Sequence, residues 1–308
     1  DFEVSEDKVL VKLRNGDELS GEVIIGAGGS YDLVSKRIRE IENMPMNWRD
    51  EDIAMALYFE VDVGREFMDE VYGEERISMA HIKYDGLDGY GWSFSKDTVL
   101  NVGIGCPRNI IKKLKSEKKG WSERKYLLDY VETLKEQGWF PKDIEIDRKM
   151  ISGANIPVGM GMSCTVGDRM MVVGDAGGFV SPLSGEGLYY ALDSGRLAAE
   201  SLDVLFSEGN FKKQDLMHYH RAWSSKWGDD LEWLKVGWHL LMVMPNSLIK
   251  YAALDEETKE FFTHMFVGSM PAAKIKNKVL ALIAKGVLKH EVLSLMTGNK
   301  QTVPDLVS

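Results

Sequence analysis

Residues 172–188 read VVGDAGGFVSPLSGEGL, and this stretch decides the fold of the chain. Val172 and Val173 continue a short apolar run, which is typical of a strand that is buried on both faces. The run ends at Gly174-Asp175 and so delivers a carboxylate to the end of the strand, where open parallel sheets bind their ligands. Four glycines follow within the stretch, and they allow the main chain to approach a ligand closely.

A long helix is predicted directly after this stretch, because apolar residues recur with helical spacing from Leu188 to Leu205. The amides and the positive dipole end of such a helix point back toward the strand end, where they can stabilise negative charge on a ligand. Asp175 can accept hydrogen bonds from ligand hydroxyls. A glycine-rich turn with a capping aspartate is the alternative, but the full run of 17 residues favours a ligand site.

A second strand followed by a turn is predicted near the start of the chain. Residues 23–25 form a continuous apolar run, which indicates a strand buried on both faces, and a glycine-rich turn begins at Gly26. A GxGxxG fingerprint is one interpretation, but Tyr31 stands where the third glycine should be. A hairpin predicted over residues 9–22 favours a position midway through a nucleotide-binding domain instead. A basic helix is predicted over residues 34–41.

Between these segments the hydrophobic period changes to two. Residues 53–106 predict an antiparallel sheet that contains a hairpin with its turn at residues 95–98. Tyr90, Trp92 and Phe94 alternate, so they share one face of a strand and could line an apolar slot. The alternative is that these aromatic residues are simply the core face of the sheet.

The composition excludes several classes of protein. The 38 Lys and Arg residues and 48 Asp and Glu residues give a net charge of −10, which argues against nucleic-acid binding. Cys106 and Cys164 are too few for a disulfide framework or a cysteine-rich metal site, and they fit a reducing compartment such as the cytoplasm. No metal site is expected. The basic residues of 112–119 predict a solvated face, with contact to a membrane surface as the alternative.

Residues 172–188 resemble the second flavin-binding motif of the FAD-dependent oxidoreductases that share the aromatic-hydroxylase fold. Within that superfamily the chain most resembles the geranylgeranyl reductase family, which includes archaeal enzymes that saturate the prenyl chains of membrane lipids. The resemblance implies that Asp175 contacts the ribityl chain of FAD and that the amides around Gly185, Gly187 and Leu188 face the pyrimidine edge of the isoalloxazine ring. The cofactor-binding residues implied are Gly26, Gly174, Asp175, Pro182, Gly185, Gly187 and Leu188.

Residues 89–96 and 101–105 carry a second match. They are similar to the family's Tyr-x-Trp-x-Phe-Pro segment and to the Asn-Val-Gly-x-Gly strand that follows it, although Ser95 stands where proline is usual. This match implies that Tyr90, Trp92 and Phe94 bind the prenyl substrate.

A third and weaker match covers residues 23–35, which resemble the superfamily's mid-domain Gly-Ala-Asp-Gly segment. Gly28 occupies the acidic position, so the electron donor stays open between NADPH and ferredoxin. The family's GxGxxG unit and its early cysteine loop are not found in residues 1–308, and residues 1–4 read like the middle of a strand. We therefore expect a fragment.

Taken together, these features predict an α/β protein with a doubly wound FAD-binding domain that is incomplete at its N-terminus. Residues 1–50 and 150–210 are assigned to that domain, residues 51–149 to an antiparallel substrate-binding domain, and residues 211–308 to a helical C-terminal region.

The predicted function is FAD-dependent reduction of isoprenoid, geranylgeranyl-type double bonds in lipid precursors. Reduced flavin would supply the hydride, and no residue is a convincing proton donor, with Tyr90 only a geometric candidate. The alternatives are a related flavoprotein monooxygenase, a quinone-linked dehydrogenase or a flavin-free lipid-binding fragment. The expected partners are an isoprenoid lipid and an electron-donor protein, and the expected location is the cytoplasm or the surface of a membrane.

Overall fold

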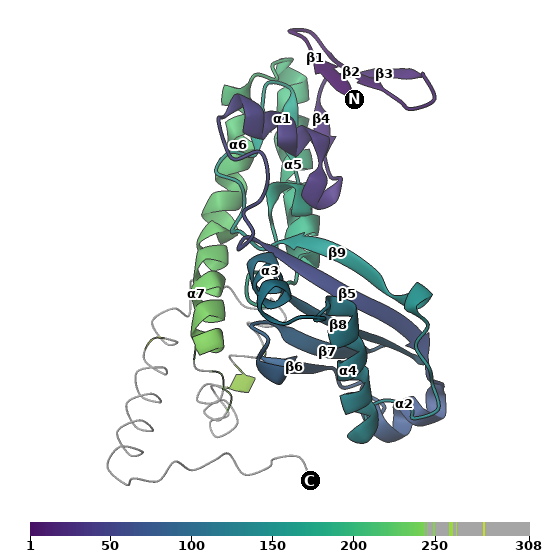
Figure 1. Ribbon diagram of the computed structural model, residues 1–308. Helices are drawn as coiled ribbons and strands as arrows, with labels where there is room; N and C mark the ends of the chain where they lie inside the picture. Colours follow the sequence, from purple (N-terminus) through teal and green to yellow (C-terminus); the bar gives the residue numbers. More distant parts are fainter. Residues whose placement is uncertain (244, 246–248, 250–258, 261–262, 264–279, 281–308) are drawn as a thin grey trace, which may run out of the picture. The chain divides into compact units, whose positions relative to one another are not determined.

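The computed structural model describes residues 1–243, 245, 249, 259–260, 263 and 280. The chain divides into two compact units (Figure 1). Unit 1 consists of Asp1–Asn47 and Val158–Ser308, and unit 2 consists of Trp48–Pro157. No helix in the described part of the chain is long and apolar enough to cross a membrane.

A three-stranded sheet with the order β10-β11-β4 lies at the centre of unit 1. Strand β11 (Met170–Val172) is fully buried, as its apolar sequence predicts, and it pairs antiparallel with β10 (Val166–Gly167) and parallel with β4 (Ile24–Gly26). The prediction that residues 23–25 are buried on both faces is wrong for Ile25, whose side chain is 42% exposed. The reason is that β4 has β11 as its single neighbour among the described strands, so it is an edge strand rather than a central one.

The helices of unit 1 pack on one another and on this sheet. The predicted helices after the two strands are confirmed as α1 (Leu33–Ile41) and α5 (Leu188–Glu208). The chain continues through α6 (Lys213–Trp223), a π-helical turn (Ser224–Gly228) and α7 (Asp229–Val243). The helical C-terminal region is thus confirmed up to residue 243, and most of residues 244–308 lie outside the described residues.

A separate antiparallel sheet opens the chain, with the order β1-β2-β3. Its strands are β1 (Phe2–Val4), β2 (Val9–Lys12) and β3 (Glu18–Gly21). Strands β2 and β3 pair with Val9 opposite Gly21, which confirms the hairpin predicted over residues 9–22.

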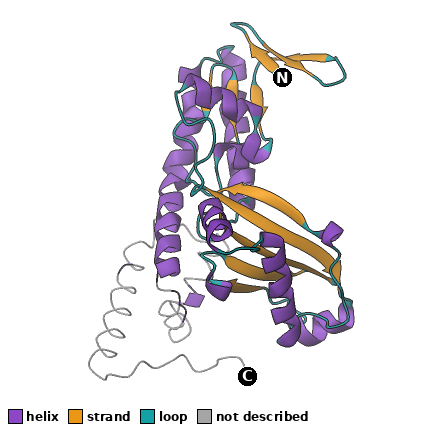
Figure 2. Ribbon diagram, viewed as in Figure 1, coloured by secondary structure: helices purple, strands orange, loops and turns teal. Residues whose placement is uncertain are grey.

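Unit 2 is an antiparallel sheet of five strands in the order β6-β7-β8-β5-β9, with helices gathered on one side (Figure 2). Its strands are β5 (Ile53–Asp62), β6 (Met79–Ile82), β7 (Tyr90–Ser95), β8 (Val99–Pro107) and β9 (Ser152–Pro157). Its helices are α2 (Arg65–Tyr72), α3 (Arg108–Glu117) and α4 (Glu123–Glu136). The hairpin predicted around residues 95–98 is confirmed as β7–β8, and α2 was not predicted.

The core of unit 2 lies between the sheet and these helices. Leu100, Val102 and Ile104 are alternate residues of β8, and all three are buried in one cluster with Tyr130 and Leu134 of α4. Since side chains alternate across a strand, the residues between them on β8 point to the opposite face of the sheet. The two faces of this sheet therefore have different surroundings.

Candidate functional site

The end of β11 approaches α5 very closely. Gly174 has a φ of +55°, and its N–H donates a hydrogen bond to Ser194 Oγ at 2.9 Å. A Cβ atom on Gly174 would lie 3.2 Å from Ala191 Cβ on α5. Glycine is required here because both the backbone conformation and the close approach exclude a side chain.

A compact loop leads from β11 to the first turn of α5. The Ser181 amide donates to the Glu186 carbonyl at 2.7 Å, and the Gly185 amide donates to the Ser181 carbonyl at 2.9 Å. Pro182 is buried within this loop. The loop ends at Gly187, the residue that precedes α5, where an added Cβ would lie 3.4 Å from Asp175 Oδ1. The Asp175 carboxylate therefore lies beside the start of α5.

Asp175 is a half-buried acceptor without a donor. Its carboxylate makes no hydrogen bond to any described residue, and burial raises its pKa above the usual range. A desolvated carboxylate in this state is costly unless a donor reaches it. The hydroxyl groups of a ribityl chain are donors of the required kind, so the site fits the flavin that the fold implies.

The start of α5 offers further donors, because the first amides of a helix have no acceptor within the helix. The Tyr189 amide is used by Glu186 Oε1 at 2.9 Å. Leu188 occupies the first helical position, and its side chain is 71% exposed. Leu188 can therefore serve a ligand through its amide rather than through its side chain.

The turn after β4 belongs to the same site. The Gly26 carbonyl accepts a hydrogen bond from the Val173 amide at 3.0 Å, which holds the ends of β4 and β11 together. The Asp32 carboxylate accepts from the Gly28 amide at 2.9 Å and caps α1 through the Ser35 amide at 2.8 Å. The sequence analysis missed Asp32, although an aspartate directly before a helical run is a recognisable capping signal.

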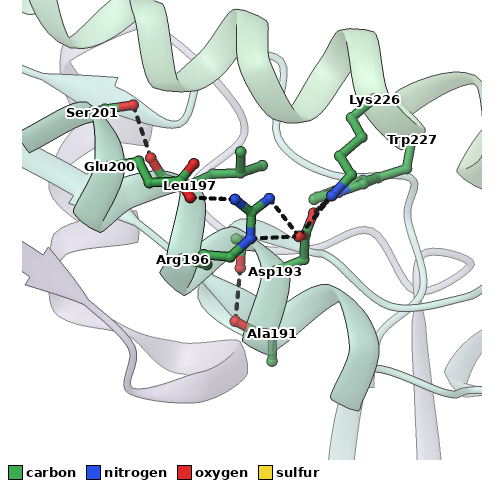
Figure 3. A network of polar contacts seen from close by, with 9 residues as sticks. Ala191, Asp193, Arg196, Leu197, Glu200, Ser201, Lys226 and Trp227 are labelled. Carbon is green, nitrogen blue, oxygen red and sulfur yellow. Dashed lines mark hydrogen bonds and ion pairs between the residues drawn. The ribbon is translucent and has the colours of Figure 1, made fainter.

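Asp193 fixes the second turn of α5 to the π-helical turn (Figure 3). Its carboxylate accepts hydrogen bonds from Arg196 at 2.9 Å, from Lys226 at 2.8 Å and from the Trp227 indole at 2.9 Å. Burial favours the neutral acid, but the hydrogen bonds from these three donors outweigh it and hold the pKa of Asp193 below its usual range. The sequence analysis missed this network because Lys226 is 33 residues away.

The loop between β11 and α5 packs against a cluster of aromatic rings through Phe179. Phe179 is fully buried, and its ring centroid lies 4.7 Å from that of Trp223 and 4.9 Å from that of Trp227. The Trp223 indole donates to Thr165 Oγ1 at 3.0 Å. The structure thus brings the predicted cofactor residues of unit 1 together beside these aromatic rings. They are Gly26, Gly174, Asp175, Pro182, Gly185, Gly187 and Leu188.

Tyr90, Trp92 and Phe94 lie on β7, in unit 2, and form a continuous row of rings. The Trp92 centroid is 5.7 Å from that of Tyr90 and 5.8 Å from that of Phe94. In the register of the hairpin, Trp92 is opposite Gly103 of β8. The row therefore points away from the helix-covered face, where the main apolar cluster of unit 2 lies, and Trp92 is itself buried on the opposite face.

The Trp92 indole lies flat on β8. A Cβ on Gly103 would be 2.2 Å from Trp92 Cζ2, so glycine is needed beneath the ring. The indole donates to Asn101 Oδ1 at 2.7 Å, and Asn101 Nδ2 donates to Glu60 Oε1 at 2.9 Å. Glu60 also pairs with Lys96. The sequence analysis did not identify Asn101 or Glu60 as supports, because the strand register decides which side chains meet.

The two cysteines are shielded from solvent in this arrangement. Cys106 and Cys164 are both buried and free, as expected, and burial raises the pKa of the Cys106 thiol to about 12. Burial also raises the pKa of Tyr90 to about 12, so this phenol stays protonated at neutral pH. Among the described residues, no group of three or more His, Cys, Asp or Glu side chains could hold a metal ion.

The chain resembles known proteins over part of its length. No protein-family model matches the chain. It is 34% identical over 176 residues to a digeranylgeranylglycerophospholipid reductase of Methanococcus aeolicus, a match that covers 56% of this chain and 41% of that protein. The reductase of the same name from Methanoculleus marisnigri is 32% identical over 219 residues, covering 70% of this chain and 48% of that protein. These matches support the predicted resemblance to the geranylgeranyl reductase family.

Solved structures confirm the predicted fold class. A geranylgeranyl bacteriochlorophyll reductase-like protein of Thermoplasma acidophilum superposes with a TM-score of 0.65 at 18% identity, covering 95% of this chain and 68% of that one. A flavin-dependent halogenase superposes with a TM-score of 0.54 at 18% identity, covering 76% of this chain and 40% of that one. At this identity the likeness shows the fold alone.

This geranylgeranyl reductase homologue also matches a menaquinone reductase of Mycobacterium tuberculosis. The two are 28% identical over 201 residues, which cover 63% of this chain and 44% of that protein. The chain spans less than half the length of the curated relatives named here.

Proposed function

We propose that the chain acts in an FAD-dependent reductase that saturates isoprenoid double bonds in lipid precursors. The observation that carries this proposal is the Asp175 carboxylate, which is half-buried beside the start of α5 and has no hydrogen-bond donor among the described residues. The similarity to digeranylgeranylglycerophospholipid reductases supports it. Unit 1 would hold the cofactor, and unit 2 would hold the substrate.

Each cofactor residue has a role in this proposal. Asp175 accepts hydrogen bonds from the ribityl hydroxyls, and the amides near Gly185, Gly187 and Leu188 stabilise negative charge on the reduced ring. Gly26, Gly174 and Pro182 shape the main chain around them. When bound, FAD supplies the hydride, whereas the protein supplies position and electrostatics.

The row formed by Tyr90, Trp92 and Phe94 would bind the prenyl chain. Flat aromatic rings offer a large apolar surface with little conformational freedom to lose, which suits a flexible hydrocarbon ligand. Tyr90 stays the candidate proton donor, since its raised pKa keeps the phenol protonated. We leave the electron donor open between NADPH and ferredoxin, and we place the protein in a reducing compartment or at a membrane surface.

The cofactor assignment is tested by titrating the chain with FAD and following flavin fluorescence. In Asp175→Asn the loss of charge-assisted hydrogen bonds should weaken FAD binding about 10- to 150-fold. The stability of the unliganded protein in urea should not fall, because the substitution removes a desolvated charge that has no partner. Asp17→Asn, an isosteric change in an exposed turn, is the control. Unchanged FAD affinity in Asp175→Asn would refute the assignment.

The activity is tested with chemically reduced FAD and a geranylgeranylated lipid. Saturation of each double bond adds one equivalent of H2, which mass spectrometry detects. A second candidate substrate is an isoprenoid quinone, because the menaquinone reductase relative matches 63% of this chain. Assays with menaquinone and with the lipid, at equal concentrations, distinguish the two.

A further inference from the structure

Residues 108–125 carry a charge opposite to that of the rest of the chain. This segment holds eight Lys or Arg residues and two Glu residues, a net charge of +6, although the whole chain has a net charge of −10. The other residues therefore carry −16 in total. Such a separation of charge gives one side of unit 2 a distinct electrostatic character.

The fold gathers these cations at the junction of α3 and α4. The Lys118 amide donates to the Leu114 carbonyl at 2.9 Å, and the Trp121 amide donates to the Lys118 carbonyl at 3.0 Å. Gly120 makes the tight turn between the helices with a φ of +81°. The end of α3 and the start of α4 are thus held close together by backbone hydrogen bonds.

Five of the cations are exposed and form no ion pair with a described residue. We call them the α3–α4 basic surface, and they are Lys113, Lys118, Lys119, Arg124 and Lys125. Two neighbours differ, because Lys112 pairs with Asp50 and Lys115 pairs with Glu123. The charge that remains after this pairing faces solvent.

Helix stability explains only part of this surface, because Lys118 and Lys119 follow the end of α3, where the helix dipole favours cations. Arg124 and Lys125 lie in the first turn of α4, where the helix dipole favours acidic residues and opposes cations. The local cost of placing two cations there indicates a role outside the helix. Trp121 lies between the lysines and the start of α4, partly buried with its ring 6.0 Å from that of Tyr126.

The composition of this surface favours a lipid bilayer over a protein partner. Four of its five cations are lysines, and lysine is depleted at protein–protein interfaces while arginine is enriched. Lysine is a hydrated point charge on a flexible stem, which suits attraction to many mobile anionic headgroups. The rest of the chain is acidic on average, with a net charge of −16, so this surface differs from it in being attracted to such headgroups.

We propose that the α3–α4 basic surface docks the protein on a bilayer that contains anionic phospholipid. This contact would bring the chain to the place where isoprenoid lipids reside, but it depends on neither flavin nor turnover. Its test therefore stands apart from that of the proposed function.

The test is flotation of the full chain with vesicles, without added flavin. The protein should bind vesicles of phosphatidylcholine mixed with phosphatidylglycerol and should not bind pure phosphatidylcholine. Binding should fall as salt increases, since the contact is between exposed charges. Neutralising Lys118, Lys119 and Lys125 to Gln together should weaken binding about 100-fold, at about fivefold for each lysine.

A matched variant controls for net charge. Lys36→Gln, Lys142→Gln and Lys149→Gln together change the same number of exposed lysines elsewhere on the chain, and this triple variant should bind as the unmodified protein does. Circular dichroism checks that both variants are folded. Equal loss in the two variants, equal binding to neutral vesicles, or tighter binding to duplex DNA or to an acidic protein at the same salt would overturn the proposal.

Discussion

At the scale of single residues, burial alone does not decide the state of a carboxylate. Asp175 and Asp193 are 18 residues apart in one strand–loop–helix segment, yet their pKa values shift in opposite directions. Asp175 has no described donor, so burial favours its neutral form. Asp193 has two cations and an indole around it, so its ionised form is favoured. Asp175 is therefore suited to a ligand that brings hydrogen-bond donors, whereas Asp193 is suited to a structural role.

Asn101 shows how one residue type can be required between two others. The Trp92 indole can only donate a hydrogen bond, and the ionised Glu60 carboxylate can only accept one. An amide offers both functions, and Asn101 accepts from the first at 2.7 Å and donates to the second at 2.9 Å. The orientation of the indole is therefore set by a residue that does not itself belong to the aromatic row.

Asn101→Leu should lower the free energy of unfolding by about 1–3 kcal/mol, because the Trp92 N–H is left without its partner. The same change in a Trp92→Phe background should cost clearly less, since phenylalanine has no N–H to strand. Urea denaturation of the two single variants and the double variant measures this coupling. If the cost of Asn101→Leu is the same in both backgrounds, the hydrogen bond does not orient the ring.

At the scale of elements, α5 is held at two levels along its length. Its start is set by Gly187 and the loop from Ser181, and its second turn is tied to the π-helical turn through Asp193. These contacts come from a strand end and from a helix far along the chain, and they leave the first turn little freedom. A helix that must present its amides to a ligand needs this kind of support.

Asp193→Asn should destabilise the protein by about 1.5–3 kcal/mol, because it converts charge-assisted hydrogen bonds into neutral ones. Glu200→Gln on the same helix is the control, since Glu200 is 58% exposed and its ion pair with Arg196 should be worth less than about 1 kcal/mol. Urea denaturation at neutral pH compares the two. If both variants lose equally little free energy of unfolding, the contacts of Asp193 do not stabilise the fold.

At the scale of the whole molecule, the described residues of each unit include one partly buried imidazole with a single hydrogen-bond partner. In unit 2, His81 Nδ1 and Tyr130 Oη are hydrogen-bonded at 2.7 Å, and in unit 1, His220 Nδ1 and Thr165 Oγ1 are hydrogen-bonded at 3.0 Å. Burial lowers the pKa of both histidines. In each unit the lowered pKa favours the neutral form of this histidine side chain at neutral pH.

This arrangement predicts that the protein loses stability on mild acidification. The unfolded chain binds protons at these histidines first, so their contribution is complete above about pH 6.5 and is lost as the pH falls below it. Each imidazole can make the free energy of unfolding change by up to about 1.4 kcal/mol more per pH unit. Urea denaturation between neutral and mildly acidic pH should show a shallower slope in His81→Gln and in His220→Gln. His218→Gln, which changes an exposed histidine, should keep the original slope, and a flatter slope in that variant as well would contradict this origin.

Local patterns in the sequence were sufficient to predict most elements. The period-two runs identified the sheet of unit 2, and the helical period identified α5, because burial of one face imposes a fixed spacing on apolar residues. The glycines and Asp175 could be recognised as a strand-to-helix ligand motif because they follow one another within a short stretch of sequence. These features depend on neighbours within a few residues along the chain.

Only the tertiary structure decided which residues meet. The alternation of Tyr90, Trp92 and Phe94 showed that they share a face, but the register with β8 decided that this face lies away from the helices. The exposure of Ile25 follows from the position of β4 at a sheet edge, and two of the three partners of Asp193, Lys226 and Trp227, come from a turn 33 and 34 residues away. Sequence periodicity fixes how side chains alternate within an element, whereas strand order and long-range partners depend on how the chain between elements returns, which no local pattern encodes.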